Sequence, residues 1–149
     1  MKNIKYRKIE KEDFGEWLRM RKTLWPKNTE KELKTEMKNI FSSKRQEVFI
    51  CVDPKDEYAG FVEVSVRNDY EVGSIARSIG YIEGIFVKYT YRKMGVAKEL
   101  IKMAEKWAKE KGCKEMGSDT KPQNKTSRAF HKKMGYKETD IIVQFSKRI

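Results

Sequence analysis

One segment near the middle of the chain, residues 81–97, constrains the fold more than any other. It begins with a mostly apolar run, continues through a turn that carries Arg92, Lys93 and Gly95, and ends in a helical pattern. A buried strand that leads directly into an amphipathic helix is typical of a sheet with helices packed on it. The first backbone N–H groups of such a helix lack internal partners, and together with the helix dipole they attract an anion. The segment therefore predicts a helix-covered sheet and a phosphate-binding turn.

Hydrophobic periodicity divides the rest of the chain into further strands and helices. The predicted strands cover residues 4–9, 47–53, 58–66, 81–87, 113–118 and 137–146. The predicted helices cover residues 14–25, 29–41, 95–112 and 125–134. This mixed order is typical of a central, largely antiparallel sheet with helices packed on it. We therefore predict a mixed α/β (α+β) fold.

Three local signals refine these boundaries. Thr29 and Glu32 fit a capping box, so the second helix is expected to begin there. Residues 68–80, which contain two glycines, are expected to form a loop. In the last predicted strand, the apolar residues 141–143 follow one another without alternation, which indicates a strand buried on both faces.

The charge of the chain is strongly positive but evenly spread. There are 34 Lys+Arg and 22 Asp+Glu residues in 149, which gives a formal net charge of +12. Such an excess is typical of nucleic-acid-binding proteins, but here lysines are mixed with glutamates and no block of five like charges occurs. A nucleic-acid-binding module is therefore the weaker interpretation, since a cationic fold also attracts an anionic cofactor. The length is that of one domain, and we predict a single domain over residues 1–149.

Membrane, secretory and metal-binding classes find no support in the sequence. The longest stretch without a charged residue, residues 141–146, is too short for a membrane span of about 20 apolar residues. The first ten residues lack the apolar stretch of a signal peptide, so a cytoplasmic location is expected. Cys51, Cys113 and the single His131 are too few for a zinc site, so no metal is expected. Two cysteines of an intracellular chain normally stay reduced.

Two segments resemble the motifs of a known superfamily. Arg92, Gly95 and Ala97 form an R-x-x-G-x-A string after the central strand, and residues 124–136 place an asparagine before a helix that ends in glycine and tyrosine. These segments resemble the acetyl-coenzyme A signature and the second motif of the GNAT acetyltransferase superfamily. Residues 24–26, 82–87, 118–119 and 135–140 resemble, more narrowly, the aminoglycoside 6′-N-acetyltransferases. The resemblance implies a GNAT fold, a mixed and mostly antiparallel sheet flanked by helices on both faces.

The resemblance implies acetyl-coenzyme A as the cofactor. In the family, backbone groups of the central strand hydrogen-bond the pantetheine arm, and the pyrophosphate lies on the loop and helix start that follow. These roles carry over to Ile85, Phe86 and Val87 for the arm, to Arg92, Lys93, Met94, Gly95, Val96, Ala97 and Lys98 for the pyrophosphate, and to Asn124 for a further cofactor contact. Residues 85–87 are equally expected as plain core, and both interpretations hold together because backbone atoms make the contact.

The resemblance also implies an aminoglycoside acceptor, acetylated on its 6′-amine. Such a molecule is a small polycation, and carboxylates bind ammonium groups through charge-assisted hydrogen bonds. By resemblance, the acceptor-binding residues are Trp25, Asn28, Tyr70, Glu83, Asp119 and Asp140, and Asp69 and Glu71 flank Tyr70. The structural alternatives are core aromatics for Trp25 and Tyr70, a turn residue for Asp119 and a surface charge for Asp140. Glu83 is the sharpest case, because a glutamate inside an apolar strand is costly unless it is paired or functional.

The predicted chemistry is direct attack of a neutral amine on the thioester. An alkylammonium has a reference pKa of about 10.4, so a carboxylate must bind it and accept its proton, directly or through water. Glu83 is the first candidate base and Asp119 the second. Many family members place a tyrosine four residues before the glycine of the second motif to protonate the leaving thiolate. Here that position holds His131, whose imidazolium can donate a proton near neutral pH or whose ring only packs on its helix. Neither cysteine has a nearby base in sequence that would favour an acyl-enzyme.

Other functions stay open at this point. The same fold can acetylate a polyamine or a protein lysine, and residues 25–29 and 68–80, outside the cofactor motif, would decide the acceptor. A catalytically inactive acyl-coenzyme A sensor is a further alternative, against which Glu83 and Asp119 argue. Relatives are often dimers, and by that analogy we expect a homodimer in which the apolar final strand pairs across subunits.

Overall fold

The computed structural model describes residues 3–69 and 77–149, and the chain divides into two compact units, residues 1–118 and 119–149. The first unit holds a five-stranded sheet with helices packed on it. The second unit holds one further helix, α4 (Lys125–Lys133), close to the range predicted for it.

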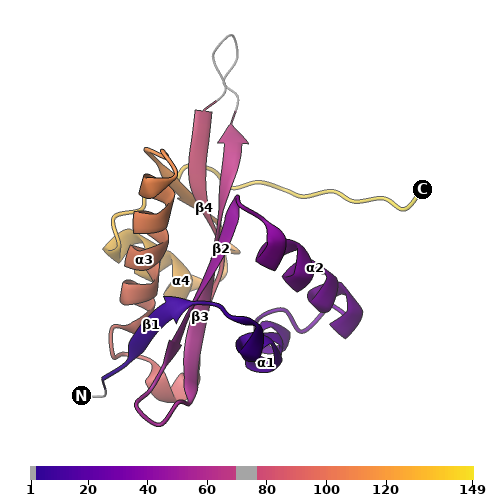
Figure 1. Ribbon diagram of the computed structural model, residues 1–149. Coiled ribbons are helices and arrows are strands. Elements are labelled where there is room, and N and C mark those ends of the chain that lie inside the picture. Colours follow the sequence, from indigo (N-terminus) through magenta and orange to yellow (C-terminus); the bar gives the residue numbers. More distant parts are fainter. Residues whose placement is uncertain (1–2, 70–76) are drawn as a thin grey trace. The chain divides into compact units, whose positions relative to one another are not determined.

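The sheet has the strand order β1-β2-β3-β4-β5, which is also the order along the chain. Its strands are β1 (Lys5–Lys8), β2 (Gln46–Val52), β3 (Tyr58–Asp69), β4 (Arg77–Val87) and β5 (Met116–Ser118). Neighbours from β1 to β4 are antiparallel, whereas β5 runs parallel to β4 (Figure 1). A parallel neighbour needs a long crossover, and a helix fills the connection between β4 and β5. The mixed, mostly antiparallel sheet confirms the predicted fold class.

Helices cover both faces of this sheet, as predicted. α1 (Phe14–Leu24) and α2 (Glu30–Ser42) lie on one face, and α3 (Val96–Glu110) lies on the other (Figure 1). α2 begins at the predicted capping box. The Thr29 hydroxyl accepts a hydrogen bond from the Glu32 backbone N–H at 3.1 Å, and the Glu32 carboxylate accepts one from the Thr29 N–H at 2.8 Å.

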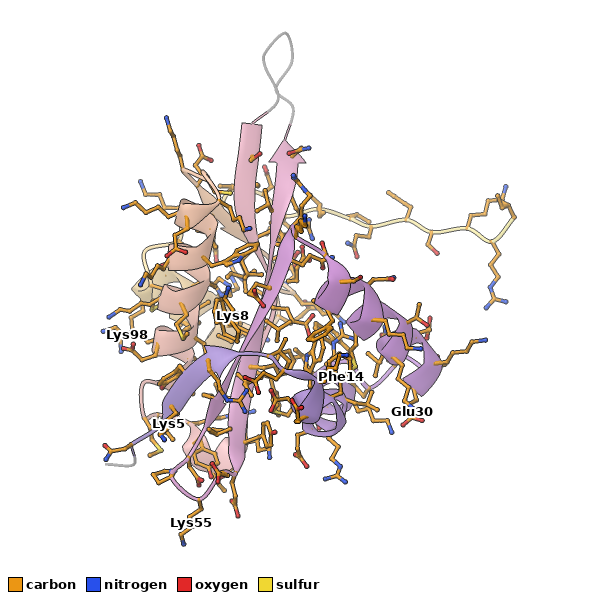
Figure 2. The ribbon with its side chains drawn as sticks, in the orientation of Figure 1. Lys5, Lys8, Phe14, Glu30, Lys55 and Lys98 are labelled. Atoms are coloured by element: carbon orange, nitrogen blue, oxygen red, sulfur yellow. The ribbon has the colours of Figure 1, made fainter. Side chains whose placement is uncertain are left out.

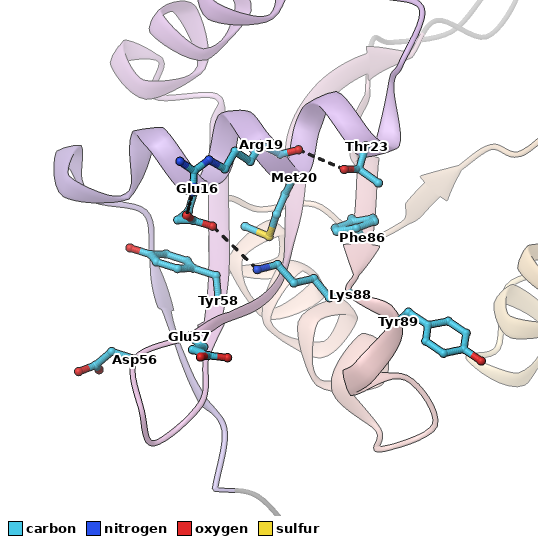
Figure 3. Close-up of a pocket in the computed structure, with 10 residues that line it drawn as sticks. All are labelled: Glu16, Arg19, Met20, Thr23, Asp56, Glu57, Tyr58, Phe86, Lys88 and Tyr89. Atoms are coloured by element: carbon cyan, nitrogen blue, oxygen red, sulfur yellow. Dashed lines mark hydrogen bonds and ion pairs between the residues drawn. The ribbon is translucent and has the colours of Figure 1, made fainter.

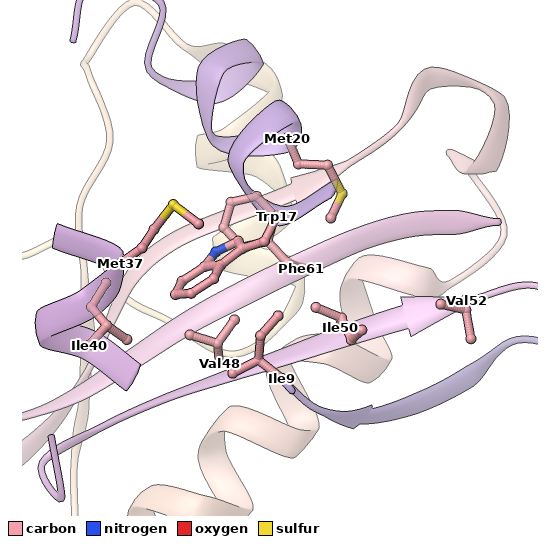
Figure 4. Packing of buried hydrophobic residues seen from close by; sticks show 9 residues of the cluster. All are labelled: Ile9, Trp17, Met20, Met37, Ile40, Val48, Ile50, Val52 and Phe61. Carbon is pink, nitrogen blue, oxygen red and sulfur yellow. The ribbon is translucent and has the colours of Figure 1, made fainter. Parts of the chain in front are cut away.

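An apolar cluster closes the face under α1 and α2 (Figure 4). Its members come from both helices, from β2 and β3 and from the end of the β1 segment: Trp17, Met20, Met37, Ile40, Val48, Ile50, Val52, Phe61 and Ile9. Trp17 and Phe61 are fully buried. Aromatic side chains bury about 150–250 Å² each, so these two contribute a large part of the apolar area in this cluster.

A buried charge network lies beside this cluster. Glu63 of β3 is 3% exposed, and its Oε2 accepts hydrogen bonds from Trp17 Nε1 at 2.9 Å and Arg21 Nε at 2.8 Å. Its Oε1 accepts a third from Arg21 Nη2 at 3.1 Å. Arg21 Nη1 also donates to the Leu33 carbonyl oxygen of α2. Burial raises the pKa of the Glu63 carboxyl, and the hydrogen bonds and charge of Arg21 oppose that rise. The network therefore joins β3, α1 and α2.

Apart from this network and the buried carboxylates of Asp13 and Asp53, most charged side chains of the described residues face solvent. Those labelled in Figure 2, Lys5, Lys8, Glu30, Lys55 and Lys98, are all exposed and belong to different parts of the first unit. The positive charge of the chain is spread over the surface, as its distribution in the sequence indicates.

Two predictions about irregular parts of the chain are wrong. Residues 68–80 are predicted as one loop, but β3 extends to Asp69 and β4 starts at Arg77, because the two strands continue their antiparallel pairing to that point. The final strand predicted over residues 137–146 is absent, and Ile141 is 75% exposed rather than buried. A strand needs a neighbouring strand for its N–H and C=O groups. The second unit, all of which the structure describes, contains no strand that could supply one.

Arg21→Met removes the partner of a buried carboxylate. We expect it to lower the free energy of unfolding by about 3–5 kcal/mol, because Glu63 is left unpaired in the core. Urea denaturation measures the change. Adding Glu63→Leu should recover most of the loss, since two apolar side chains then replace the ion pair. Lys22→Met, which removes an exposed ion pair with Glu30, is the matched control and should leave the midpoint nearly unchanged. A double variant no more stable than Arg21→Met alone would contradict this account.

Candidate active site

Glu83 is an extra residue in the pairing of β4 with β3. Gly84 pairs with Glu63 and Ile82 pairs with Val64, so Glu83 has no direct partner on β3. One extra residue in a strand forms a β-bulge, which bends the strand and re-aims the local side chains. The single carboxylate within the apolar stretch of β4 therefore lies where the regular alternation of the strand is interrupted.

The carboxylate of Glu83 lies on the face of the sheet that α1 and α2 cover. Its hydrogen-bond donors, Ser65 and Arg67, share that face with Glu63 because they lie two and four residues further along β3. Glu83 Oε2 accepts from Ser65 Oγ at 2.5 Å and from Arg67 Nε at 2.9 Å, and Oε1 accepts from Arg67 Nη2 at 2.7 Å. A carboxylate has about four acceptor positions, so Glu83 keeps the capacity for one further donor. It is paired, and it can still bind an ammonium group.

Trp25 lies directly over the bulged part of β4. A Cβ atom on Gly84 would lie 2.6 Å from two carbon atoms of the Trp25 ring, so a side chain at this position would displace the ring. The guanidinium carbon of Arg21 lies 4.7 Å from the centroid of the same ring, and the Phe61 ring lies 6.4 Å from it. Trp25 therefore packs on the core and also borders the space above β4, so its two interpretations are compatible.

A cavity of about 460 Å³ opens beside this part of the sheet. Residues of α1, α2, β2, β3, β4 and the connection after α1 line it: Arg21, Trp25, Asn28, Glu36, Asn39, Ile40, Gln46, Glu63 and Glu83. Three of the predicted acceptor residues, Trp25, Asn28 and Glu83, come together here. The lining holds three carboxylates and one guanidinium, and a second guanidinium, that of Arg67, pairs with Glu83, so the cavity keeps an excess of one negative charge although the chain carries a net charge of +12. Cavities of about 300–1,000 Å³ commonly hold small molecules.

Three residues of this lining are not among those predicted from the sequence: Glu36, Asn39 and Gln46. Glu36 precedes the buried Ile40 by four residues, so it lies beside the apolar face of α2, and Asn39 lies three residues further along. Helical spacing therefore places both residues at the border of the buried face. Which border residues face a cavity depends on how the helix packs, which the spacing does not specify.

A larger cavity, of about 730 Å³, lies between α1, the turn after β2 and the end of β4 (Figure 3). Of the predicted site residues only Phe86 lines it. Three carboxylates and two cations line this cavity, and Glu16 contacts both cations, Arg19 at 2.6 Å and Lys88 at 3.9 Å. This cavity holds none of the predicted acceptor residues, whereas the smaller one holds three of them, so the smaller cavity is the better match for the predicted acceptor site.

One edge of β4 is unpaired beyond the bulge. β5 pairs with β4 only over residues 80–82, so among the described residues of the first unit no strand pairs with this edge of residues 83–87. β3 pairs with the other edge, and the Phe86 side chain packs against the apolar cluster. Backbone groups of residues 85–87 that face this edge can therefore hydrogen-bond an extended ligand, except the Val87 carbonyl oxygen, which accepts from Arg92 Nε, while the Phe86 side chain stays against the apolar cluster. This geometry fits a pantetheine arm.

The turn before α3 has the geometry of an anion site. Gly95, the N-cap of α3, has a φ of +78°, a left-handed conformation that glycine adopts at little cost. The Glu99 N–H donates to the Gly95 carbonyl oxygen at 3.1 Å, so the N–H groups of residues 96–98 have no acceptor within the helix. Arg92 Nε donates to the Val87 carbonyl oxygen at 3.0 Å and ties the turn to the end of β4. Helix dipole, backbone donors and basic side chains together fit a pyrophosphate.

The second unit carries four of the predicted residues: Asp119, Asn124, His131 and Asp140. Asn124 Oδ1 accepts a hydrogen bond from the Ser127 N–H at 3.0 Å, so this side chain caps α4. His131 Nδ1 lies 2.7 Å from the Ser127 carbonyl oxygen, and Nδ1 donates because a carbonyl oxygen only accepts. Asp119 and Asp140 are exposed and lie outside regular elements. Their roles toward acceptor and cofactor stay predictions.

The predicted acceptor residues between β3 and β4 are described only in part. Asp69 ends β3, whereas Tyr70 and Glu71 lie outside the described residues. The part of Tyr70 in acceptor binding therefore stays a prediction.

In the part of the chain that the structure describes, the cysteines are buried and the metal-binding residue types form no cluster. Cys51 and Cys113 are buried, and burial raises the pKa of Cys51 to about 12 and also raises that of Cys113. A thiol that ionises only at such high pH is a poor nucleophile, which favours direct attack over an acyl-enzyme. Within residues 3–69 and 77–149, no group of three or more His, Cys, Asp or Glu side chains is arranged to hold a metal ion. No helix in these ranges is long and apolar enough to cross a membrane.

The chain is similar in sequence to one family over most of its length. The sequence profile of the acetyltransferase (GNAT) family matches residues 14–136. Aminoglycoside N(6′)-acetyltransferase type 1 of Salmonella enteritidis is 35% identical over 143 residues, which cover 95% of this chain and 97% of that protein. The protein of the same name from Klebsiella aerogenes is 35% identical over 144 residues, which cover 95% of this chain and 94% of that protein.

Solved structures agree with the sequence comparison. The aminoglycoside N-acetyltransferase AAC(6′)-Iy in complex with CoA has a TM-score of 0.90 at 32% identity, covering 100% of this chain and 97% of that chain. AAC(6′)-Iy in complex with the bisubstrate analog CoA-S-monomethyl-acetylneamine has a TM-score of 0.89 at 33% identity, covering 99% of both chains. The predicted fold of the superfamily is therefore confirmed.

Two glycine substitutions test the approach of Trp25 to β4. Gly84→Ala should destabilise the protein by about 1–3 kcal/mol, because the added Cβ overlaps the Trp25 ring. Gly15→Ala in α1, where nothing lies within 4 Å of the added atom, should stabilise it by about 0.5–1 kcal/mol. Thermal unfolding of the two variants measures both changes. Equal effects of the two substitutions would show that the ring does not lie against the strand.

Proposed function

The chain belongs to the GNAT family of acetyltransferases, and from this we propose that it acetylates the 6′-amino group of aminoglycoside antibiotics and so confers resistance to them. Its cofactor is acetyl-coenzyme A, the acetyl donor of the family. The names of relatives at 35% identity support this acceptor, and so does the analog bound in a similar structure, which joins CoA to an acetylated neamine.

The acidic cavity beside the bulge of β4 carries the proposal. An aminoglycoside is a small molecule with several ammonium and hydroxyl groups, and it needs carboxylates and neutral hydrogen-bonding groups close together. The cavity supplies three carboxylates, two asparagines and a glutamine around a tryptophan, on a chain whose remaining surface is positive. This local negative charge is opposite in sign to the net charge of the protein. The protein as a whole therefore repels a cation, and only this cavity favours one.

In this proposal Glu83 binds and deprotonates the reacting amine. Its carboxylate takes the ammonium group at the acceptor position that Ser65 and Arg67 leave open, and it accepts the amine proton directly or through a water molecule. The bound cofactor supplies an acetyl thioester, and transfer forms the C–N bond and releases the thiol. His131 is the proposed proton donor to the leaving sulfur, and it acts through Nε2 because Nδ1 donates to the Ser127 carbonyl oxygen. Asp119 is the second candidate base.

Backbone groups hold the cofactor in this proposal. The unpaired edge of residues 85–87 binds the pantetheine arm, and the turn and helix start at residues 92–98 bind the pyrophosphate. The Asn124 carboxamide, whose oxygen caps α4, contributes through its NH₂ group. A strand N–H near Val87 is the proposed donor to the developing oxyanion.

We propose that residues 1–149 form one acetyltransferase domain that works as a homodimer. The family profile runs from the first unit into the second, which supports one domain. Residues 141–143 are apolar and exposed, which supports a segment that pairs across subunits. Asp140 and Tyr70 are further proposed acceptor contacts. Neither nucleic acid nor a membrane takes part, and the reaction takes place in the cytoplasm, where acetyl-coenzyme A is made.

Thiol release from acetyl-coenzyme A tests the acceptor. We expect turnover with kanamycin, which has a 6′-amine, and none with paromomycin, which has a hydroxyl at that position. A thiol-reactive dye follows the reaction continuously. Equal turnover with both acceptors would place the reaction at another amine.

Failure with both acceptors would overturn the aminoglycoside proposal. Spermidine and a lysine-containing peptide would then be compared in the same assay, because the same fold can acetylate a polyamine or a protein lysine. Binding of acetyl-coenzyme A, measured by calorimetry, shows separately whether the protein is folded and loaded.

Glu83→Gln tests the proposed base. We expect kcat for kanamycin to fall about 100-fold, because the amide binds the amine but cannot accept its proton. The KM for acetyl-coenzyme A should stay within about twofold. Glu16→Gln, in the larger cavity, is the matched control and should retain full activity. An unchanged kcat would remove Glu83 as the base and make Asp119→Asn the decisive variant.

A further inference from the structure

The three carboxylates of the acidic cavity differ in how fully they are paired. Glu63 is almost fully buried, and Trp17 and Arg21 donate three hydrogen bonds to it. Glu83 also receives three, from Ser65 and Arg67. Glu36 of α2 receives one, from Arg21 Nη1 to its Oε1 at 3.2 Å, and its side chain is 51% exposed.

The charge of Arg21 is already balanced without Glu36. Arg21 and Glu63 form a two-point ion pair in which both side chains are 4% exposed. This buried pair carries no net charge. The contact from Arg21 therefore orients Glu36 but leaves the negative charge of its carboxylate uncompensated at the cavity wall.

The surroundings of Glu36 suit an amino sugar. Asn28, Asn39 and Gln46 line the same cavity and offer neutral donors and acceptors for hydroxyl groups, and part of the Trp25 ring adds apolar surface to the lining. Glu36 is held on a helix whose buried face packs on β2, and the hydrogen bond from Arg21 fixes the direction of its side chain. A carboxylate held in this way can bind a cation without first becoming ordered.

We propose that Glu36 is an acceptor-binding carboxylate that pairs with an ammonium group other than the one acetylated, and that it sets the preference for polycationic acceptors. This inference rests on the proposed function, since it assigns a second ammonium subsite to the same cavity. Glu83 binds the amine that reacts, and Glu36 binds a second amine of the same molecule. A charge-assisted hydrogen bond at a half-exposed position strengthens binding without contributing to the chemical step.

Glu36→Gln tests this inference because it keeps the shape of the side chain and its hydrogen bond to Arg21. We expect the KM for kanamycin to rise about tenfold at low salt, while kcat and the KM for acetyl-coenzyme A stay within about twofold. The rise should shrink when salt is added, since ions screen a half-exposed charge pair. Glu36→Asp, which keeps the charge on a shorter side chain, should restore part of the affinity. The urea midpoint of each variant shows whether folding has changed.

Glu30→Gln is the matched control, because it removes one negative charge from the same helix at an exposed position outside the cavity lining. It should leave the KM for kanamycin unchanged. A KM in Glu36→Gln that stays within twofold of the wild type would overturn the subsite, and so would an equal rise in Glu30→Gln. Lack of wild-type turnover with kanamycin is a different result: it overturns the proposed function, and the second subsite with it.

Discussion

The buried carboxylate of Glu63 is the constraint on which the first unit depends. A charge in the core must be paired, and the only partner that reaches both of its oxygens within residues 3–69 and 77–149 is Arg21 of α1. The same guanidinium donates to the Leu33 carbonyl oxygen of α2, lies against the Trp25 ring and contacts Glu36. The pairing of this one charge therefore holds α1 and α2 on the sheet. It also positions Trp25 and Glu36, which line the acidic cavity. Removing that partner would disturb the fold and the site together.

The candidate site lies where the sheet departs from regular pairing. The bulge places Glu83 on the face of α1 and α2, in hydrogen-bond reach of Ser65 and Arg67. The short β5 leaves the far edge of residues 83–87 unpaired in the described part of the first unit. A regular, fully paired strand would offer neither a re-aimed carboxylate nor backbone groups for a ligand. Irregular pairing in β4 is thus what would allow this one strand to take both roles that the proposed function gives it, toward the acceptor and toward the cofactor.

The charge that bears on the proposed function is that of the cavity and not the net charge of the chain. The net charge of +12 describes the surface, on which lysines and glutamates of separate elements are mixed. The cavity has the opposite sign because α2, β3 and β4 each contribute one carboxylate to it. Glu36 shows how this arises. In the sequence it is one of three glutamates of a charged helix, and only the packing of α2 on the sheet brings it to the cavity that holds Glu83.

The sequence alone determined the elements whose signals are local. The capping box at Thr29, the apolar strand and glycine turn of residues 81–97 and the resemblance to the superfamily all depend on neighbours along the chain, which is why they could be predicted. Predictions were wrong or missing wherever the position of a residue depends on partners far away in the chain. The apolar residues 141–143 indicated a buried strand, but a strand forms only beside another strand, and the second unit has none. The tertiary structure also decided the bulge at Glu83 and the place of Glu36, because both arise from pairing and packing between segments far apart in the chain.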